Sequence, residues 1–419
     1  MMSNAKGRRP QTALVIGGGV VGLACAMTLR LRGIDTLLLE PALVQRGASW
    51  GNAGHIAVEQ VEPLASLRTI RSFPGRLFWR GGALSLPAHE IAAWLPFTAR
   101  LLQASRPRRF AAGKEALKSI VGQAMPAWRR LSAEADAQAL IVEDGHYIVW
   151  ETAAGARAGR QSWNSTDIGA ASIRDVTPQE AASLSSLMAR PPAGAVRFVG
   201  TGRVRDPGDL TDRLAAAFVA SGGVQRRERA QTMSIEKSHA SVFLVSGERL
   251  SADAIVVAAG VGSAPLLEQI GHRAPVIAER GYHIQSDTTD WPDLPPVVFE
   301  ERSMIVSRFR TGLRAASFVE FGRENTPADP RKWQRLRSHV AELGLSFTAP
   351  GSEWMGARPT LPDYLPAIGR SNRADNLLYA FGHQHLGLTL AAITGEMIGA
   401  LSVGEDPALD AGPFSLDRF

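Results

Sequence analysis

The pattern of apolar and polar positions is most informative near the start of the chain. Residues 12–16 (TALVI) form a short apolar run typical of a buried strand. Residues 20–32 have the composition of a helix, which Gly33 ends, and residues 35–40 (DTLLLE) again predict a strand. The pattern therefore predicts a strand–helix–strand (βαβ) unit.

The remaining pattern comes in blocks. Residues 66–138 are mainly helical in pattern, and "DGHYIVWE", "TPQEAASL" and "DPGDLTDRLAAAFVASGGV" then predict a strand, a capped helix and another helix. Short alternating strands follow and end in "AIVVAAGVGS", whose continuous apolar character is typical of a buried parallel strand. Residues 276–350 predict sheet and loop, and "NLLYAFGHQHLGLTLAAITGEMIGAL" predicts a strand, a glycine- and histidine-rich loop and a long helix.

Composition narrows the class of protein. The chain has 419 residues, of which 45% are hydrophobic, and this is enough for two domains with buried cores. Its 46 basic and 40 acidic residues are interspersed, so the net charge of +6 predicts no nucleic-acid partner but favours anionic small molecules or an anionic membrane surface. The single cysteine, Cys25, excludes an intrachain disulfide, lies in the predicted helix core and favours a reducing compartment. No uninterrupted apolar run reaches membrane-spanning length, which predicts a cytoplasmic protein and leaves peripheral membrane contact open.

The glycines of the βαβ unit indicate a nucleotide. Gly17, Gly19 and Gly22 fit G-x-G-x-x-G between the strand and the helix, and Glu40 ends the second strand. Gly17 permits the tight turn, Gly19 lets a pyrophosphate approach the helix N-terminus, and Gly22 lets the helix pack closely on the strand. Glu40 is placed to accept hydrogen bonds from a ribose diol. We predict an ADP-containing dinucleotide, which this fingerprint alone does not identify as NAD or FAD.

Four stretches in their order along nearly the whole chain resemble the FAD-dependent D-amino acid oxidase/dehydrogenase family. They are "VIGGGVVGLACAMTLRLRG" with Glu40, "GASWGNAGHI", "VVAAGVGS", and "GARPTLPDYLPAIG" together with "GHQHLGLTL". The resemblance implies non-covalently bound FAD and an α/β fold, in which a Rossmann-like FAD-binding domain of the glutathione-reductase type is interleaved with an α+β substrate domain built on a mostly antiparallel sheet. The expected FAD-binding domain comprises residues 1–65, 200–275 and 355–419, and the expected substrate domain comprises residues 66–199 and 276–354.

The cofactor-binding residues are expected in these same stretches. Small residues let a planar ring lie against backbone, Ser49 and Asn52 supply polar contacts, and the helix after "HLGLTL" directs its N-terminal amides at the flavin N1 and C2 carbonyl, where negative charge develops. Simple turn formation is the alternative role for the glycines. The predicted set is Gly17, Gly19, Val20, Val21, Gly22, Glu40, Ser49, Trp50, Asn52, Ala53, Gly54, Ala259, Gly260, Gly382, Gly387, Leu388 and Thr389.

Arg358 is the main candidate for substrate binding. It lies between Gly356 and Pro359 in a segment too rich in proline and glycine to be the middle of a helix. The family resemblance implies that the arginine of "G-x-R-P" binds the substrate carboxylate, for which a guanidinium offers two parallel donors. A surface ion pair or a structural anchor is the alternative.

Other polar residues are weaker catalytic candidates. Tyr282 and His283 lie in "ERGYHI", which is similar to the family's substrate-domain strand, His55 follows the flavin loop, and His383 and His385 follow Gly382. Functional and structural roles both stay open for these residues. His383 and His385 lack a nearby carboxylate in sequence, and no metal site is predicted.

The C-terminal stretches most resemble a bacterial branch that oxidises cis-4-hydroxy-D-proline to a pyrroline carboxylate. That substrate is therefore expected, with hydride transfer from the α-carbon to flavin N5. A broad D-amino acid dehydrogenase, an N-methyl amino acid oxidase and a flavin subunit of a heteromeric complex are the alternatives. A quinone or another electron acceptor, a homo-oligomer, and membrane contact through residues 68–82, which otherwise form a loop over the substrate domain, also stay open.

Overall fold

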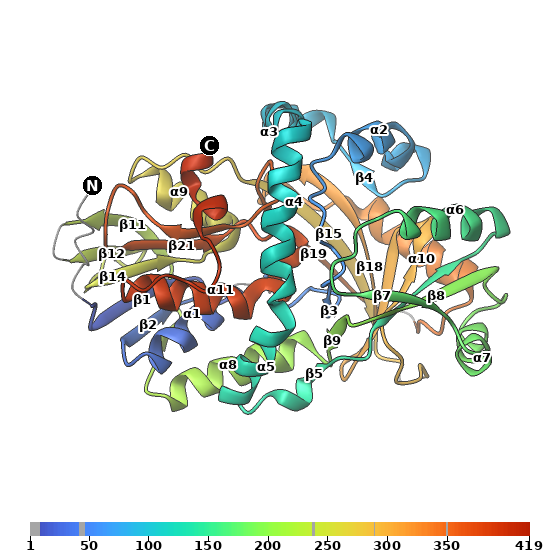
Figure 1. Ribbon diagram of the computed structural model, residues 1–419, viewed down its shortest axis with the longest axis horizontal. Coiled ribbons are helices and arrows are strands. Elements are labelled where there is room, and N and C mark those ends of the chain that lie inside the picture. Colours follow the sequence, from blue (N-terminus) through green and yellow to red (C-terminus); the bar gives the residue numbers. More distant parts are fainter. Residues whose placement is uncertain (1–8, 42–46, 237–238, 289, 349–350) are drawn as a thin grey trace.

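The chain forms two large sheets that lie side by side in the computed structural model, which describes residues 9–41, 47–236, 239–288, 290–348 and 351–419 (Figure 1). One sheet has six strands in the order β10-β2-β1-β14-β21-β20, and the other has nine. Two three-stranded sheets, β11-β12-β13 and β3-β9-β5, complete the strand pairing. The long helix α4 crosses between the two halves in Figure 1.

The six-stranded sheet begins with the predicted βαβ unit. Its strands are β1 (Thr12–Ile16), β2 (Asp35–Leu39), β10 (Val224–Arg226), β14 (Ala254–Val257), β20 (Ala367–Arg370) and β21 (Leu377–Phe381). All neighbours are parallel except β20 and β21. Chain segments from the start, middle and end of the sequence therefore build one sheet, and β14, predicted from "AIVV", lies beside β1.

Different elements pack on the two faces of this sheet. Ala13 and Val15 of β1 pack with the helices α1 (Val20–Leu31), α8 (Pro207–Ala220) and α11 (Gly387–Ser402), whereas Leu14 and Ile16 pack toward β11 (Ala230–Ile235), β12 (Ala240–Leu244), β13 (Arg249–Ala252) and α9 (Ser263–Glu268). Successive side chains of a strand point to opposite faces, so a run of apolar residues is needed to bury both. Cys25 is fully buried in α1, as predicted, and burial raises the pKa of its thiol to about 12.

The nine-stranded sheet is mostly antiparallel, which confirms the expected fold class. Its strands are β4 (Leu84–Ser85), β6 (His146–Trp150), β7 (Ser172–Asp175), β8 (Gly194–Val199), β15 (Ile277–Ser286), β16 (Val297–Phe299), β17 (Met304–Phe309), β18 (Gly312–Gly322) and β19 (Ser352–Thr360). Among these described strands, only the β6–β16 and β4–β18 pairs are parallel. The small third sheet holds β3 (His55–Ile56), β5 (Ile141–Val142) and β9 (Gly202–Val204).

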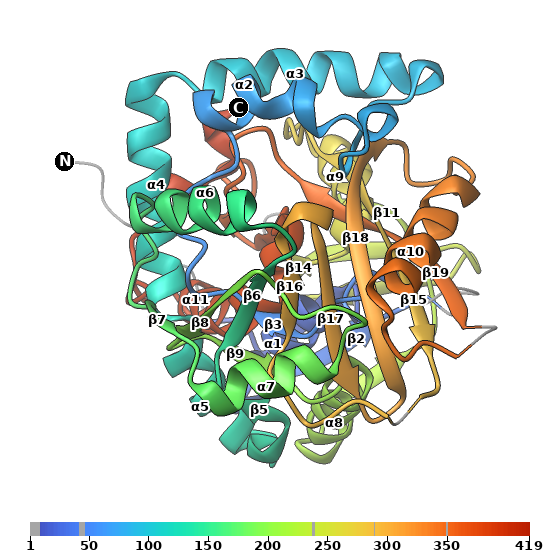
Figure 2. The ribbon, with the colours of Figure 1, turned by 90° about the vertical axis from the view of Figure 1, so that its right-hand side faces the viewer.

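The helical block predicted after residue 66 is present. It contains α2 (Leu67–Arg76), α3 (Ile91–Ala104), α4 (Pro107–Gly122) and α5 (Ala124–Glu134). Residues 68–82, expected as a loop, instead form most of α2 and a short 3-10 turn, and Figure 2 shows α2 and α3 along one edge of the molecule. The remaining helices are α6 (Ala153–Asn164), α7 (Pro178–Ser186) and α10 (Pro330–Leu343). The capped helix predicted from "TPQEAASL" is α7, whose cap is a capping box between Thr177 and Glu180.

Three elements depart from the domain division expected from the sequence. Strand β19 runs through residue 355 and stays in the nine-stranded sheet up to Thr360, where an isolated bridge joins it to His383. Helices α4 and α5 share a buried core with the six-stranded sheet, through residues such as Leu117 and Trp128. Pro359 fits within β19 because this is the edge strand of its sheet, where a missing N–H breaks no second ladder.

Candidate active site

A cavity of about 1100 Å³ lies between the two large sheets. Its wall includes the ends of β1, β2 and β14, the loop after residue 47, the start of α11, and parts of α2, β15, β18 and β19. Open parallel sheets bind ligands outside the carboxyl ends of their strands, which accounts for the nucleotide end of the cavity. The second sheet closes the other end.

The glycine fingerprint forms the nucleotide end. Gly17 has a φ of +108°, which favours glycine, and a Cβ on Gly22 would lie 1.8 Å from the Gly17 carbonyl oxygen. The Ser49 hydroxyl accepts a hydrogen bond from Val20 N at 3.1 Å, and the Glu40 carboxylate accepts one from Gly18 N. Burial raises the pKa of Glu40, although the Gly18 amide opposes this shift. These roles of Gly17 and Gly22 are those predicted for a dinucleotide fold.

The loop from Gly47 to Ile56 is anchored by a residue from the other sheet. Arg314 of β18 donates from Nη1 to the carbonyl oxygens of Trp50 at 2.8 Å and Asn52 at 2.6 Å, and from Nε and Nη2 to Gln285 Oε1. Its guanidinium also lies over the Trp50 ring. Burial lowers the pKa of Arg314 to about 10, but the side chain stays charged near neutral pH. Arg314 thus fixes the backbone of the loop that is expected to face the flavin.

The start of α11 closes the cavity beside this loop. Leu388 accepts a hydrogen bond from Trp128 Nε1 at 2.9 Å, and the Thr389 hydroxyl accepts one from Ala57 N at 2.9 Å. Gly387 begins the helix and lines the cavity, so its amide end faces the space left for a ligand.

Most of the predicted cofactor-binding residues are brought together here. The cavity wall contains Gly17, Gly19, Val20, Val21, Glu40, Ser49, Trp50, Asn52, Ala53, Ala259, Gly260, Gly387 and Leu388. The other four, Gly22, Gly54, Gly382 and Thr389, lie behind that wall. Gly54 and Gly382 have φ values of +75° and +78°, so they allow the chain to turn rather than line the cavity.

Arg358 reaches the same cavity from β19. Its Nη1 donates to Glu279 Oε1 at 3.1 Å and to the Phe318 carbonyl oxygen at 3.4 Å, and the side chain is 25% exposed. The second oxygen of Glu279 accepts hydrogen bonds from the hydroxyls of Thr360 and Tyr364. Among the described residues, Nη2 and Nε of Arg358 have no hydrogen-bond acceptor, so they are available to a carboxylate.

Tyr282 lines the cavity, but its hydroxyl belongs to a buried ionic cluster. The hydroxyl donates to Glu320 Oε1 at 2.8 Å and accepts from Arg280 Nη2 at 3.0 Å. Lys332 also contacts Glu320, and these charged side chains are at most 2% exposed. Burial raises the pKa of Tyr282 to about 12. The Tyr282 hydroxyl is therefore occupied by structural hydrogen bonds and is not a free donor for a substrate.

His283 lies behind the cavity wall. Its ring stacks on Trp354 with centroids 4.8 Å apart, and Nδ1 lies 3.2 Å from the Gly51 carbonyl oxygen. A Cβ on Gly51 would lie 2.2 Å from the Trp354 ring, so the loop packs directly on this stack. Burial lowers the pKa of His283 well below its ordinary value. The neutral His283 ring packs behind the loop that is expected to face the flavin.

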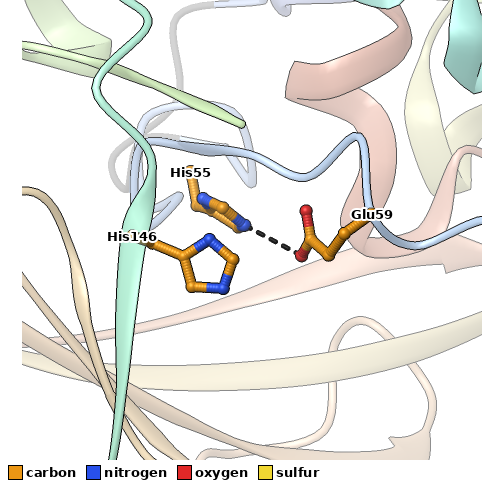
Figure 3. A group of neighbouring side chains, drawn as sticks. All are labelled: His55, Glu59 and His146. Carbon is orange, nitrogen blue, oxygen red and sulfur yellow. Dashed lines mark hydrogen bonds and ion pairs between the residues drawn. The ribbon is translucent and has the colours of Figure 1, made fainter. Parts of the chain in front are cut away.

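His55 lines the cavity within a group of three side chains (Figure 3). Its Nε2 lies 3.0 Å from Glu59 Oε1, and its ring meets that of His146 edge-on with centroids 4.4 Å apart. Burial would raise the pKa of Glu59, but the charges of His55 and His146 and the His55 hydrogen bond outweigh it and lower the pKa to about 2. Burial lowers the pKa of His146 to about 3.

His383 and His385 also line the cavity. His383 Nε2 lies 3.0 Å from the Thr394 hydroxyl, and His385 Nε2 pairs with Gln60 Oε1. Burial lowers the pKa of His383 to about 3 and that of His385 to about 4. Both rings are therefore neutral near pH 7.

The residues of the site that were missed from the sequence include Glu279, Arg314 and Gly281. Glu279 and Gly281 both lie within the "ERGYHI" motif and both contact Arg358. They are two residues apart, and residues at this spacing lie on the same face of a strand, so the motif contains a signal for them. Arg314 carries no comparable signal because its partners are backbone carbonyls far away in sequence.

A dinucleotide cradle joined to a cavity with a fixed cation defines a flavin- or nicotinamide-type oxidoreductase. The cradle fits FAD, because a buried glycine turn, a helix N-terminus and Glu40 meet in one cavity that extends past Ser49 to Gly387. The chain belongs to the DAO family of FAD-dependent oxidoreductases, whose model matches residues 12–401. The protein is accordingly an FAD-binding oxidoreductase that acts on amino acids.

Named relatives agree with this family. The chain is 30% identical to a D-amino-acid oxidase of Bradyrhizobium diazoefficiens over 97% of its length and 98% of the relative. It is 28% identical to D-amino acid dehydrogenase 2 of Ralstonia nicotianae over 96% of its length and 99% of the relative. Glycine oxidase from Geobacillus kaustophilus has the same fold, with a TM-score of 0.70 at 21% identity, and the alignment covers 98% of this chain and 99% of that one.

Proposed function

We propose that this enzyme oxidises a D-configured imino or amino acid, with cis-4-hydroxy-D-proline as the leading substrate and a pyrroline carboxylate as product. FAD, held without a covalent link by residues such as Gly17, Glu40 and Ser49, would supply N5 as the acceptor for the hydride of the substrate α-carbon. The single observation that carries the proposal is Arg358, a cation held by Glu279 at the wall of the dinucleotide cavity.

The role of Arg358 follows from its contacts. Glu279 uses one oxygen for Nη1, which fixes the guanidinium but leaves its other edge for a substrate carboxylate. Anchoring the carboxylate fixes the α-carbon, and such positioning supplies much of the rate enhancement in a reaction that needs no side-chain base. The other catalytic candidates, His55, Tyr282, His283 and His383, then act on the shape and polarity of the pocket.

The substrate end of the cavity suits a compact ring. Phe73, Phe318 and Tyr364 contribute aromatic surface to the cavity wall, and Gln60 and His385 supply a hydrogen-bonded polar pair. The stretches that contain Arg358 and His383 resemble the hydroxyproline-degrading branch of the family. Two solved structures of the same fold are an iminodiacetate oxidase and an L-proline dehydrogenase, and both names denote secondary amines.

The domain division expected from the sequence is part of the proposal. Residues 1–65, 200–275 and 355–419 bind FAD, and residues 66–199 and 276–354 bind the substrate, with β19 and helices α4 and α5 spanning the two units. The predicted cofactor-binding residues contact FAD directly where they line the cavity and shape its wall elsewhere. This division puts Arg358 at the junction.

A cytoplasmic location and electron transfer to a quinone or another acceptor complete the proposal. No helix in the described parts of the chain is long and apolar enough to cross a membrane. Peripheral contact is supported by the edge formed by α2, the 3-10 turn that follows it and α3, where Trp79 is 72% and Leu95 53% exposed among several arginines. A homo-oligomer is compatible with the same exposed edge.

Anaerobic reduction of the flavin tests the substrate. Purified holoenzyme is mixed with D-, L- and N-alkyl amino acids, and absorbance near the flavin maximum is followed. Rapid bleaching by cis-4-hydroxy-D-proline, faster than by acyclic D-amino acids, supports the proposal. Faster bleaching by acyclic D-amino acids or by sarcosine favours the corresponding alternative, and FAD binding without bleaching by any of them favours a subunit of a heteromeric complex.

Substitution of Arg358 tests the mechanism. Arg358→Ala should raise KM and lower kcat/KM by about 100-fold or more while FAD stays bound, because the carboxylate loses a bidentate charged partner. Arg337→Ala is the matched control, since Arg337 is 51% exposed and pairs with Glu353 on the outer surface. Near-normal kinetics of Arg358→Ala would refute the clamp.

A further inference from the structure

His55, Glu59 and His146 form a compact group beside the cavity (Figure 3). His55 lies on β3, Glu59 in the segment that follows it, and His146 at the start of β6, so three parts of the fold meet here. One potential ligand atom from each residue lies within 4.8 Å of the others. Figure 3 shows the dashed contact between His55 and Glu59, with the His146 ring beside them.

Two of these three polar side chains are buried, so each of their polar atoms needs a partner. Glu59 is 4% exposed and His146 2% exposed. Glu59 Oε2 is completely buried, and no hydrogen-bond partner for it exists among the described residues. A buried carboxylate oxygen without a partner is costly, and an unexplained one in a native fold calls for a bound ion or water.

His146 is already oriented as a metal ligand. Its Nδ1 lies 3.0 Å from the Thr201 hydroxyl, and its ring stacks on Phe198 at 4.4 Å, which fixes the ring and leaves Nε2 for a ligand. Metal-binding histidines commonly use the other ring nitrogen for a second hydrogen bond of this kind. Thr201 is itself fully buried, so this bond is part of the protein interior.

We propose that His55, Glu59 and His146 bind one divalent transition-metal ion of the zinc class. Two imidazole nitrogens and one carboxylate are a ligand set that zinc accepts, with a further position left for water. The ion neutralises Glu59 and supplies a partner for its second oxygen. The sequence predicted no metal, because His146 is remote from the pair His55 and Glu59 that lies four residues apart.

The metal has a positioning role. His55 is the only one of the three ligands that also lines the cavity, so the ion fixes a wall residue of the site. It takes no part in electron transfer, because a zinc-class ion does not change its oxidation state. The inference holds whichever amino acid is the substrate.

Metal analysis of the holoenzyme is the first test. Protein stripped with a chelator and dialysed against Zn²⁺ should retain about one ion per chain after gel filtration. Co²⁺ used as a second probe should give visible bands at wavelengths beyond the flavin absorption, with the intensity of a site of low coordination number that contains nitrogen ligands. Wild-type protein that retains no stoichiometric metal, or gives only the weak spectrum of hydrated Co²⁺, would overturn the proposal.

Variants locate the ion. Glu59→Gln and His146→Gln should each weaken Zn²⁺ binding by more than about 100-fold, and Thr201→Val, which removes only the oriented hydroxyl, by about 10- to 100-fold. His239→Gln is the control, because the His239–Glu236 pair is a surface histidine–carboxylate contact at 3.4 Å. Unchanged binding in both ligand variants, or loss in the control alone, places the metal elsewhere.

The wild-type result remains decisive if a ligand variant does not fold. Flavin content and thermal unfolding report folding for each variant. Thr201→Val retains all three ligand side chains, so it gives the location in that case. Full Zn²⁺ affinity in a folded Thr201→Val protein contradicts the proposed orientation of His146.

Discussion

Gly281 lies directly against the guanidinium of Arg358: a Cβ on Gly281 would fall 2.2 Å from Arg358 Nη2. The register of β15 and β19 places Glu279 opposite Arg358 and Gly281 opposite Gly356. The guanidinium of Arg358 is therefore positioned by the Glu279 carboxylate and by the space that Gly281 leaves because it has no side chain.

Gly281→Ala should displace Arg358 without unfolding the protein. Gly281 does not have a left-handed φ, so its backbone accepts alanine, and the atoms in the way are the far end of a flexible side chain. We expect kcat/KM to fall by about 10- to 100-fold through misplacement of the carboxylate partner. Steady-state kinetics and flavin content measure this. Gly122→Ala, with open space at the Cβ position, should leave both unchanged; equal activity of the two variants contradicts the packing argument.

Glu40→Ala should weaken FAD binding. Glu40 contacts Gly18 at the nucleotide end and is placed for the ribose hydroxyls, and a charged hydrogen bond contributes about 1.5–3 kcal/mol. Fluorescence titration of the flavin-free protein should show a dissociation constant raised by about 10-fold or more. Asp35→Ala is the control on the same strand, since Asp35 is 83% exposed and pairs with Arg30 at the opposite end. An unaltered affinity of Glu40→Ala for FAD would contradict a role of Glu40 in binding the ribose.

Arg314→Met should destabilise the expected flavin-facing loop. The change leaves the carbonyl groups of Trp50 and Asn52 without their donor, which costs about 2 kcal/mol or more in free energy of unfolding. Chemical denaturation and the rate of FAD loss are the measurements, and both should change together. Arg310→Met, which breaks the exposed Arg310–Asp209 pair on the neighbouring turn, should cost much less, because an exposed ion pair contributes little to stability. A similar small cost for both would show that Arg314 does not hold the loop.

Stability should decrease as the pH falls from about 6.5 toward 4, in part because of His383. Burial lowers the pKa of His383 to about 3 from an ordinary 6.5, so the unfolded chain binds the proton first. The stabilisation is complete above pH 6.5 and is lost as the pH falls toward 3, at about 1.4 kcal/mol per pH unit.

Thermal unfolding of His383→Gln and wild-type holoenzyme between pH 7.5 and 5 checks this expectation. The variant should show a shallower decrease in Tm as the pH falls, whatever its absolute stability. His239→Gln, at a partly exposed histidine, should follow the wild-type curve. Parallel curves for His383→Gln and wild type would exclude His383 as a contributor.

The local parts of the fold were predictable because their signals are local. The βαβ unit, its glycine turn and the capped helix after Thr177 each depend on residues within one short segment. The position of Glu40 at the end of β2, beside the glycine turn, was predictable for the same reason. The direction of β15 side chains was not predictable, because all ten residues of this strand are buried and no polar alternation marks its two faces.

The contacts that complete the site are non-local. Arg314 reaches backbone oxygens of residues 50 and 52, and His146 meets His55 from a different sheet. Neither partnership leaves a spacing that a single sequence reveals. Arg358 was singled out by its motif, yet the strand that carries it was not predicted. Its prolines and glycines excluded the middle of a helix, whereas an edge strand tolerates proline.

The bridge between Thr360 and His383 has a consequence for altering this enzyme. It ties the strand that bears Arg358 to the backbone that leads into α11, so main chain sets the distance between the proposed carboxylate anchor and the start of that helix. Phe73 and Leu101 contribute cavity wall from α2 and α3 and lie outside that linkage. Libraries aimed at new side-chain preferences should vary these helical positions first, since they can enlarge or reshape the pocket while the reacting carbon keeps its place.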